Sequence, residues 1–265
     1  MSRLVAVIGF VAERVLASAS ELNRLDAAAG DGDLGVTMST AARAVLGSMP
    51  DLAGQSPSDV LRICGTTLAR EAPSTSGTLL ATGLLAAGRE LAGDPGSDGA
   101  TLSRLLAAAT DAIASRGGAG AGSKTMLDAL IPAAAAAADS ARRGDDLGTG
   151  LEAAARAADD GTQATTSMVP RFGRAGWLPE RSAGHEDPGA RLVAIILDSA
   201  NEAMAQNQSM NRSDRGFPSP PGQPSPKTQR HQSRRRDTGN RVDQLVQIES
   251  PDSNGPPAED QIRCQ

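Results

Sequence analysis

Hydrophobic positions recur with a helical period through the first 206 residues of the chain, and short stretches rich in glycine, proline and aspartate interrupt them. The pattern predicts about eight helices, at residues 3–22, 35–48, 57–70, 77–92, 100–115, 124–142, 147–166 and 187–206. Most of the glycine-rich and aspartate-rich sequence falls between these segments. We therefore expect an all-α fold whose functional groups lie on loops and helix starts, where backbone N–H groups are free.

The composition supports this fold class and narrows the cellular setting. The chain has three Phe, one Trp and no Tyr, so its core must be built from Ala, Leu, Val and Ile, which suits closely packed helices. The two cysteines, Cys64 and Cys264, are too few for a disulfide framework and indicate a reducing compartment. Glu13 and Arg14 interrupt the apolar N-terminal stretch too early for a membrane span. We expect a cytoplasmic protein without a membrane partner.

The composition changes abruptly after residue 206, which predicts two parts, a helical domain at 1–206 and a disordered tail at 207–265. Eight of the 16 prolines lie in the tail, among Ser, Gln, Asn and the run Arg234–Arg236. Such a segment buries too little apolar surface to offset the entropy of ordering it. An inert extension is the favoured interpretation, and a tethering segment is the alternative. The net charge of -5 gives no reason to expect a specific nucleic-acid partner.

Three carboxylates crowd the connection between the first two predicted helices. Asp31 and Asp33 are separated by one glycine, and Asp26 lies a short loop upstream. Anions this close repel one another unless cations neutralise them, and carboxylate oxygens are ligands that Mg²⁺ prefers. A solvated turn with helix-capping aspartates is an equally open interpretation of the string alone. The helix that follows favours a Mg-nucleotide site, because its amino end can hold phosphate oxygens and Thr37 adds a hydroxyl in the first turn.

Three further stretches carry candidate chemistry. Residues 73–78 place small hydroxyl side chains before a helix, as either an ordinary N-cap or an anion cradle, and the N-cap is favoured. Residues 115–126 contain Gly, Lys and Thr together but lack the spacing of a Walker A phosphate loop, which we therefore exclude. Residues 173–190 form a long loop in which Arg174 matches phosphate geometry, whereas His185 is more typical of a loop hydrogen-bonding residue than of a metal ligand.

These four stretches, in this order and spacing, resemble the L subunit, the nucleotide-binding domain, of the dihydroxyacetone kinase family. The family pattern runs L-D-x-x-x-G-D-x-D-H-G, then G-G-A-S-G-P-L before a helix, then S-R-G followed by K-T-M, and finally G-R-A-S-Y-L-G-E-R-S-I-G-H-Q-D-P-G-A. The resemblance extends from Leu25 to Ala190. Leu34 stands where the family commonly has His, Thr75 replaces Ala, Gly176-Trp177 replaces Ser-Tyr and Pro179 replaces Gly, so the substrate and the phosphoryl donor stay open.

The resemblance implies an eight-helix antiparallel barrel that holds ATP or ADP at one end with two Mg²⁺ ions. On the matching positions, Asp26, Asp31 and Asp33 would coordinate the metals. The residues implied in nucleotide binding are Leu34, Gly35, Val36, Thr37, Thr75, Ser76, Gly117, Met126, Arg174, Asp187, Pro188 and Gly189. Those of the first two stretches would contact phosphates, largely through backbone N–H groups, and the others would surround the rest of the nucleotide, with Met126 against the base.

The resemblance also implies a phosphotransferase that works with a partner. In the family a ketose is held covalently on a separate K subunit or domain, which also supplies the acid–base groups. We expect no catalytic residue on this chain, and we expect it to be inactive without a K-type partner. The phosphoryl donor is either exchanging ATP, which we favour, or a phosphotransferase-system protein. A tetrulose kinase, a fatty-acid kinase nucleotide domain and a non-catalytic nucleotide sensor are the alternatives, and the pattern leaves a homodimer open.

Overall fold

The computed structural model describes residues 3–92, 98–172 and 182–214, and every regular element in these ranges is a helix. The helices are α1 (Arg3–Ala17), α2 (Ala19–Ala29), α3 (Leu34–Gly47), α4 (Met49–Leu52), α5 (Pro57–Glu71), α6 (Thr75–Glu90), α7 (Gly99–Gly117), α8 (Leu127–Arg143), α9 (Leu147–Ala164), the 3₁₀ helix η1 (Thr165–Ser167) and α11 (Pro188–Asp214). The all-α prediction is confirmed. Across the described ranges, no helix is both long and apolar enough to cross a membrane.

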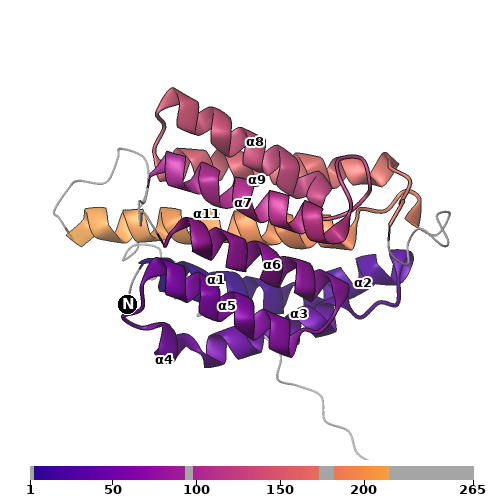
Figure 1. The fold of residues 1–265 in the computed structure, drawn as a ribbon, viewed down its shortest axis with the longest axis horizontal. Helices are drawn as coiled ribbons and strands as arrows, with labels where there is room; N and C mark the ends of the chain where they lie inside the picture. Colours follow the sequence, from indigo (N-terminus) through magenta and orange to yellow (C-terminus); the bar gives the residue numbers. More distant parts are fainter. Residues whose placement is uncertain (1–2, 93–97, 173–181, 215–265) are drawn as a thin grey trace, which may run out of the picture. The chain divides into compact units, whose positions relative to one another are not determined.

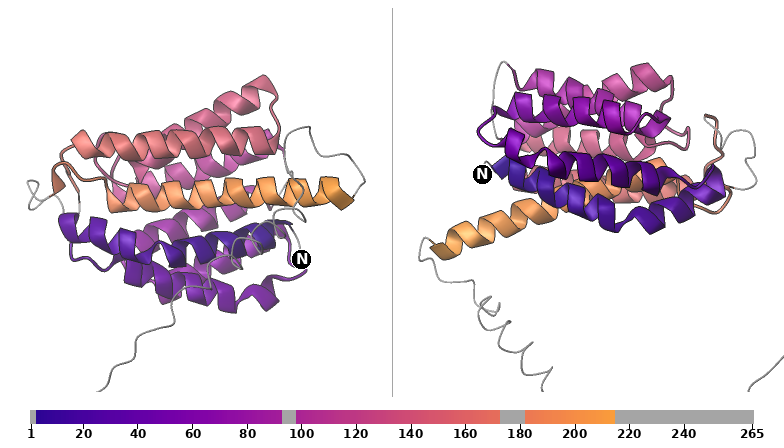
Figure 2. Two further views of the ribbon diagram at one scale, coloured as in Figure 1. Left: turned by 180° about the vertical axis from the view of Figure 1, so that it is seen from behind. Right: turned by 90° about the horizontal axis from the view of Figure 1, so that it is seen from below.

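The long helices lie side by side and their contacts close a ring (Figures 1 and 2). Contacts link α1 to α3, α3 to α5, then each helix to the next from α5 to α9, and α9 to α11. The ring closes because α11 also packs against α1. The short helices α2 and α4 are additional elements that both contact α3.

Three boundaries differ from the expectation. The single helix expected at 3–22 is instead two helices that together run to Ala29, with a break at Ser18 whose hydroxyl donates to the Arg14 carbonyl at 2.9 Å, so Asp26 lies in α2 rather than in the connection after it. Helix α4 follows α3 almost directly. Helix α11 continues to Asp214, where the compact helical unit ends, rather than to residue 206. From residue 215 onward, the predicted tail lies outside the described residues.

Small side chains let neighbouring helices approach closely. Alanines at i and i+4 form the buried faces of α8 and α9, which pack on each other in the larger core cluster. Where these helices cross, a Cβ on Gly161 would lie 2.2 Å from the Asp128 carbonyl oxygen. Leucines such as Leu22, Leu127 and Leu192 fill the wider parts of the interior. The alanine-rich composition therefore serves close helix packing, as the sequence suggested.

Side-chain caps fix several helix starts. Ser56, Ser74, Asp98 and Asp146 each accept a hydrogen bond from the backbone N–H three residues later. Each cap satisfies one of the amides that a helix start leaves without an intrahelical partner. The cap at Ser74 is the one that bears on function, because it sets where the first turn of α6 begins.

Candidate functional site

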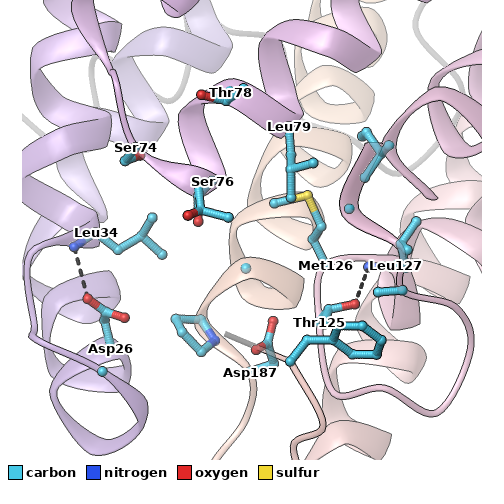
Figure 3. A pocket seen from close by; sticks show the side chains of 18 of the residues that line it. Asp26, Leu34, Ser74, Ser76, Thr78, Leu79, Thr125, Met126, Leu127 and Asp187 are labelled. Carbon is cyan, nitrogen blue, oxygen red and sulfur yellow. Dashed lines mark hydrogen bonds between the residues drawn. The ribbon is translucent and has the colours of Figure 1, made fainter. Parts of the chain in front are cut away.

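A cleft of about 620 Å³ lies where four connections of the helical unit meet. These connections lead into α3, α6, α8 and α11. Figure 3 shows Asp26 and Leu34 on one side of the cleft, Met126 and Leu127 on the other, and Ser76 and Asp187 between them. Its lining comprises Asp26, Gly30, Asp31, Asp33, Leu34, Thr37, Ser74, Thr75, Ser76, Thr78, Leu79, Ile113, Arg116, Gly117, Ala119, Lys124, Thr125, Met126, Leu127, Phe172, Asp187, Pro188 and Gly189.

The three predicted metal ligands form one cluster in this cleft. Asp26, Asp31 and Asp33 each offer a carboxylate oxygen, and these oxygens lie within 4.8 Å of one another. One oxygen of Asp26, Oδ2, accepts the backbone N–H groups of Asp33 at 2.9 Å and Leu34 at 3.1 Å. These two hydrogen bonds tie the last turn of α2 to the start of α3. They do not involve Oδ1 of Asp26, which is the oxygen that could serve as a metal ligand. Three converging carboxylates are a donor set that fits hard divalent cations such as Mg²⁺.

The first turn of α3 reaches the cleft only in part. Leu34 and Thr37 line the cleft, whereas the side chain of Val36 is 60% exposed and lies outside the lining. Gly35 is pressed against α2, because a Cβ on it would lie 1.9 Å from the Ala19 carbonyl oxygen.

The backbone N–H groups of this turn already have protein acceptors at three positions. They are the amide of Leu34 on Asp26, that of Val36 on Oδ1 of Asn23 at 3.2 Å, and that of Thr37 on the Asp33 carbonyl at 2.9 Å. The hydroxyl of Thr37 is therefore better placed than these amides to donate a hydrogen bond to a phosphate.

The start of α6 turns its polar end toward the cluster. Oγ of Ser74 accepts the Gly77 amide at 3.1 Å, which confirms the N-cap interpretation, while Thr75, Ser76 and Thr78 line the cleft. A Cβ on Gly77 would lie 2.1 Å from the Ala72 carbonyl oxygen, so this turn is held tightly against the preceding chain. The N-terminal end of a helix carries partial positive charge, which stabilises anions placed beside it.

The wall opposite the acidic cluster comes from the connection between α7 and α8. Gly117 and Met126, both predicted from the sequence, line the cleft, and Met126 is buried. The carboxylate of Asp128 accepts the backbone N–H groups of Gly122 at 2.5 Å and Thr125 at 2.8 Å, which shapes the turn before α8. Arg116, at the end of α7, adds a positive charge to the lining.

The residues before α11 complete the cleft. Asp187, Pro188 and Gly189 line it, and Oδ1 of Asp187 accepts the Ala190 amide at 2.7 Å, which caps α11. Burial raises the pKa of Asp187 to about 7, although the Ala190 amide favours its charged form. The side chain of His185 is exposed. Arg174, also predicted as a nucleotide ligand, lies outside the described residues.

Several lining residues could not be predicted from the sequence. Leu79, Ile113 and Phe172 give the cleft an apolar portion beside Met126, but in the sequence the first two are indistinguishable from ordinary core positions. The sequence predicts no role for Lys124 once a Walker A loop is excluded, although this residue is only 3% exposed and borders the cleft. Its position in a glycine-rich turn was the only available signal, and that signal does not reveal which groups it contacts.

Comparison with known proteins identifies the fold. The model of the DAK2 domain family matches residues 28–202. The D-erythrulose kinase of Mycolicibacterium smegmatis is 38% identical over 200 residues, which are 73% of this chain and 34% of that protein. The ADP-binding subunit DhaL of the PEP-dependent dihydroxyacetone kinase of Escherichia coli is 32% identical over 176 residues, which are 66% of this chain and 84% of that protein.

A solved structure gives the same result. The dihydroxyacetone kinase of C. freundii, in complex with AMP-PNP and Mg²⁺, superposes with a TM-score of 0.62 at 26% identity, over 77% of this chain and 34% of that one. The chain thus spans about a third of the length of that kinase and of the erythrulose kinase, but most of the length of the E. coli subunit.

Proposed function

The chain belongs to the DAK2 domain family, and on this premise we propose that it is the ATP- or ADP-binding subunit of a ketose kinase. One observation carries the proposal. The carboxylates of Asp26, Asp31 and Asp33 converge in the same cleft as the N-terminal end of α6. A cation site beside an anion site is the arrangement that a magnesium-bound polyphosphate requires.

The residues divide into three groups by chemistry. The three aspartates would hold two Mg²⁺ ions, and the hydroxyls of Thr37, Thr75 and Ser76 would contact phosphates. The rest of the nucleotide would lie across the apolar portion of the cleft, near Gly117, Met126 and the turn Asp187–Gly189. Arg174 belongs to the proposed set through its match to the family pattern. The cleft volume of about 620 Å³ lies within the usual range for ligand sites of this kind.

The proposed reaction is phosphoryl transfer to a ketose hydroxyl. Bound magnesium would neutralise phosphate charge that would otherwise repel the incoming hydroxyl. The residues of this chain would position the donor: the α6 end orients its phosphates, and the apolar wall excludes water from one side. Because the aspartates are assigned as ligands, we place the base that activates the hydroxyl on a K-type partner that also holds the ketose. The chain alone would therefore bind nucleotide without transferring phosphate.

A small ketose of three or four carbons is the proposed substrate class. The support is that relatives at 31–38% identity are erythrulose kinases, whereas the E. coli relative is a subunit of a dihydroxyacetone kinase. We propose that free ATP, which exchanges with the bound nucleotide, is the phosphoryl donor. The alternative is that a phosphotransferase-system protein rephosphorylates bound ADP, and an assay with each donor distinguishes the two.

Nucleotide binding is the first test. ADP and ATP affinities are measured by calorimetry with Mg²⁺ and with EDTA, for the wild type and for Asp31→Asn/Asp33→Asn. We expect Mg²⁺-dependent binding that the double variant loses while its helical content is unchanged. Asp51→Asn/Asp111→Asn, which removes the same charge from exposed positions, is the matched control and should bind normally. Unchanged binding by Asp31→Asn/Asp33→Asn would contradict the metal assignment.

The second test adds a K-type subunit. Phosphorylation of dihydroxyacetone and of erythrulose is followed with ATP, and separately with phosphoenolpyruvate and the phosphotransferase proteins. We expect activity only when both subunits are present. Nucleotide binding without transfer to either ketose would instead support a nucleotide-sensing regulator.

A further inference from the structure

We propose that Lys124 is a positioning residue that fixes the cleft wall formed by Met126 and the turn Asp187–Gly189. Its ammonium donates to three backbone carbonyls, those of Met168 at 3.2 Å, Ser182 at 2.8 Å and His185 at 2.9 Å. These acceptors lie 44, 58 and 61 residues away along the chain. The inference rests on the proposed function, since it concerns the geometry of the nucleotide cleft.

The three acceptors match the chemistry of a lysine. An ammonium group has three donors and no acceptor, so three convergent carbonyls satisfy it completely. A guanidinium presents its donors in a flat fork and cannot reproduce this arrangement. The chain nevertheless uses Arg at 24 of its 26 basic positions, and Lys124 is the only lysine in the described ranges. The choice of lysine at this position is therefore informative.

The backbone at this position is also unusual. With a φ of 57°, Lys124 is the only non-glycine residue in the described ranges that has a positive φ. Such a conformation is unfavourable for a residue with a side chain and persists only where the surrounding contacts hold it. The three carbonyls supply those contacts.

Lys124 connects the two sides of the cleft wall. It lies two residues before Met126, and its side chain reaches the segment that leads into the turn Asp187–Gly189. The two sides meet directly, because a Cβ on Gly189 would lie 3.4 Å from Cβ of Met126. A displaced Lys124 would therefore shift both surfaces that we assign to the nucleotide.

A second anchor acts on the far end of the same segment. The Asp187 amide donates to Oγ1 of Thr165 at 2.8 Å, and Oγ1 of Thr162 donates to the Ala190 carbonyl at 3.0 Å. Both threonine side chains are fully buried. Because this second anchor comes from α9 and η1, the lysine can be removed without releasing the turn from these helices.

Charges near Lys124 support the arrangement. Burial lowers the pKa of its ammonium, and the carboxylate of Asp187 acts in the opposite direction. Its full satisfaction by carbonyls explains how a cation remains at a position only 3% exposed.

The test removes the side chain and then supplies its missing atoms. Lys124→Ala lacks the equivalent of 1-propylammonium, which can enter the vacated space and donate to the same carbonyls. Amide hydrogen exchange of residues 182–190 is measured without nucleotide, and ADP affinity is measured with Mg²⁺. We expect faster exchange in that segment and a loss of affinity of about 10-fold or more, because small misplacements of binding groups are costly. Added 1-propylammonium should reverse both changes, and tetramethylammonium, which has no N–H donor, should reverse neither.

Two further variants complete the experiment. Lys124→Arg keeps the charge but not the three-donor geometry and should restore at most part of the affinity, whereas Arg142→Ala, an exposed change on α8, should behave as the wild type. Unchanged exchange in Lys124→Ala, full function in Lys124→Arg, or equal effects of the two ammonium ions would overturn the inference. If Lys124→Ala folds only with an added amine, recovery with 1-propylammonium alone supports it, and no recovery overturns it. A wild type that binds no nucleotide contradicts the proposed function, but the exchange measurement decides the role of Lys124 independently.

Discussion

Asp26 has a structural role and a proposed metal-binding role, and two substitutions distinguish them. Its Oδ2 accepts the amides of Asp33 and Leu34, and we propose that Oδ1 binds the metal. In Asp26→Asn, the amide oxygen can take the place of Oδ2 and keep both hydrogen bonds, which leaves an NH₂ group facing the metal position. Asp26→Ala removes the bonds and the ligand together. Both variants lose the same charge, so repulsion from the other two carboxylates changes equally in the two.

The expected difference in stability follows from those two bonds. A neutral hydrogen bond contributes about 1 kcal/mol net, so the pair is worth about 2 kcal/mol in Asp26→Asn relative to Asp26→Ala. The higher helix propensity of alanine returns about 0.5 kcal/mol, because Asp26 lies within α2. The net difference of about 1.5 kcal/mol corresponds to roughly 3–6 °C in melting temperature for a domain of this size.

Thermal and urea unfolding in EDTA measure this difference without any metal contribution. Asp26→Asn should be the more stable variant, and neither variant should gain stability from Mg²⁺ with ADP, whereas the wild type should. If Asp26→Ala is as stable as Asp26→Asn in EDTA, the capping role of Asp26 is wrong. If Asp26→Asn retains the full stabilisation by Mg²⁺ and ADP, its role as a ligand is wrong.

Three further predictions concern the helix crossing, the carboxyl of Asp187 and the tail. Gly35→Ala should lose about 3 kcal/mol of unfolding free energy in urea titrations, because its Cβ meets the Ala19 carbonyl oxygen, whereas Gly47→Ala in the same helix meets nothing within 4 Å and should cost nothing. The pKa of Asp187 is raised from 3.8 to about 7, so this carboxyl ionises at a lower pH in the unfolded chain than in the folded one. The wild type therefore loses stability as pH rises from about 4 to 7. The stability of Asp187→Asn relative to wild type should increase over this window by about 1.4 kcal/mol per unit of pKa shift, and a constant difference would contradict the assignment. Truncation after Asp214, where the compact unit ends, should change neither melting temperature nor ADP affinity, and a marked loss of either would show that the tail contributes to the fold or the site.

Most helices could be predicted because their periodicity is interrupted by glycine or proline. The exceptions have physical reasons. Ser18 ends α1 without either residue, and its hydroxyl bond to Arg14 becomes visible only in three dimensions. The late end of α11 was missed because the polar sequence after residue 206 resembles the tail more than a packed helix.

The site could be predicted where it consists of short contiguous motifs, and not where distant segments converge. Asp26, Asp31 and Asp33 are neighbours in sequence, so their cluster in the cleft could be anticipated. Gly35 was predicted to approach phosphate, yet its missing side chain serves the crossing with α2. Lys124 depends on carbonyls more than 40 residues away, and no local pattern indicates them.

The contact between α1 and α11 also has a consequence for the order of events during synthesis. Because the last helix both closes the ring and brings the turn Asp187–Gly189 to the cleft, a nascent chain that lacks α11 has an incomplete ring and an incomplete site. The acidic cluster near the N-terminus emerges from the ribosome early, but the turn Asp187–Gly189 emerges more than 150 residues after it. If the proposed function holds, the nucleotide site is complete only once the final helix docks, and nucleotide added during refolding would report the completion of the fold.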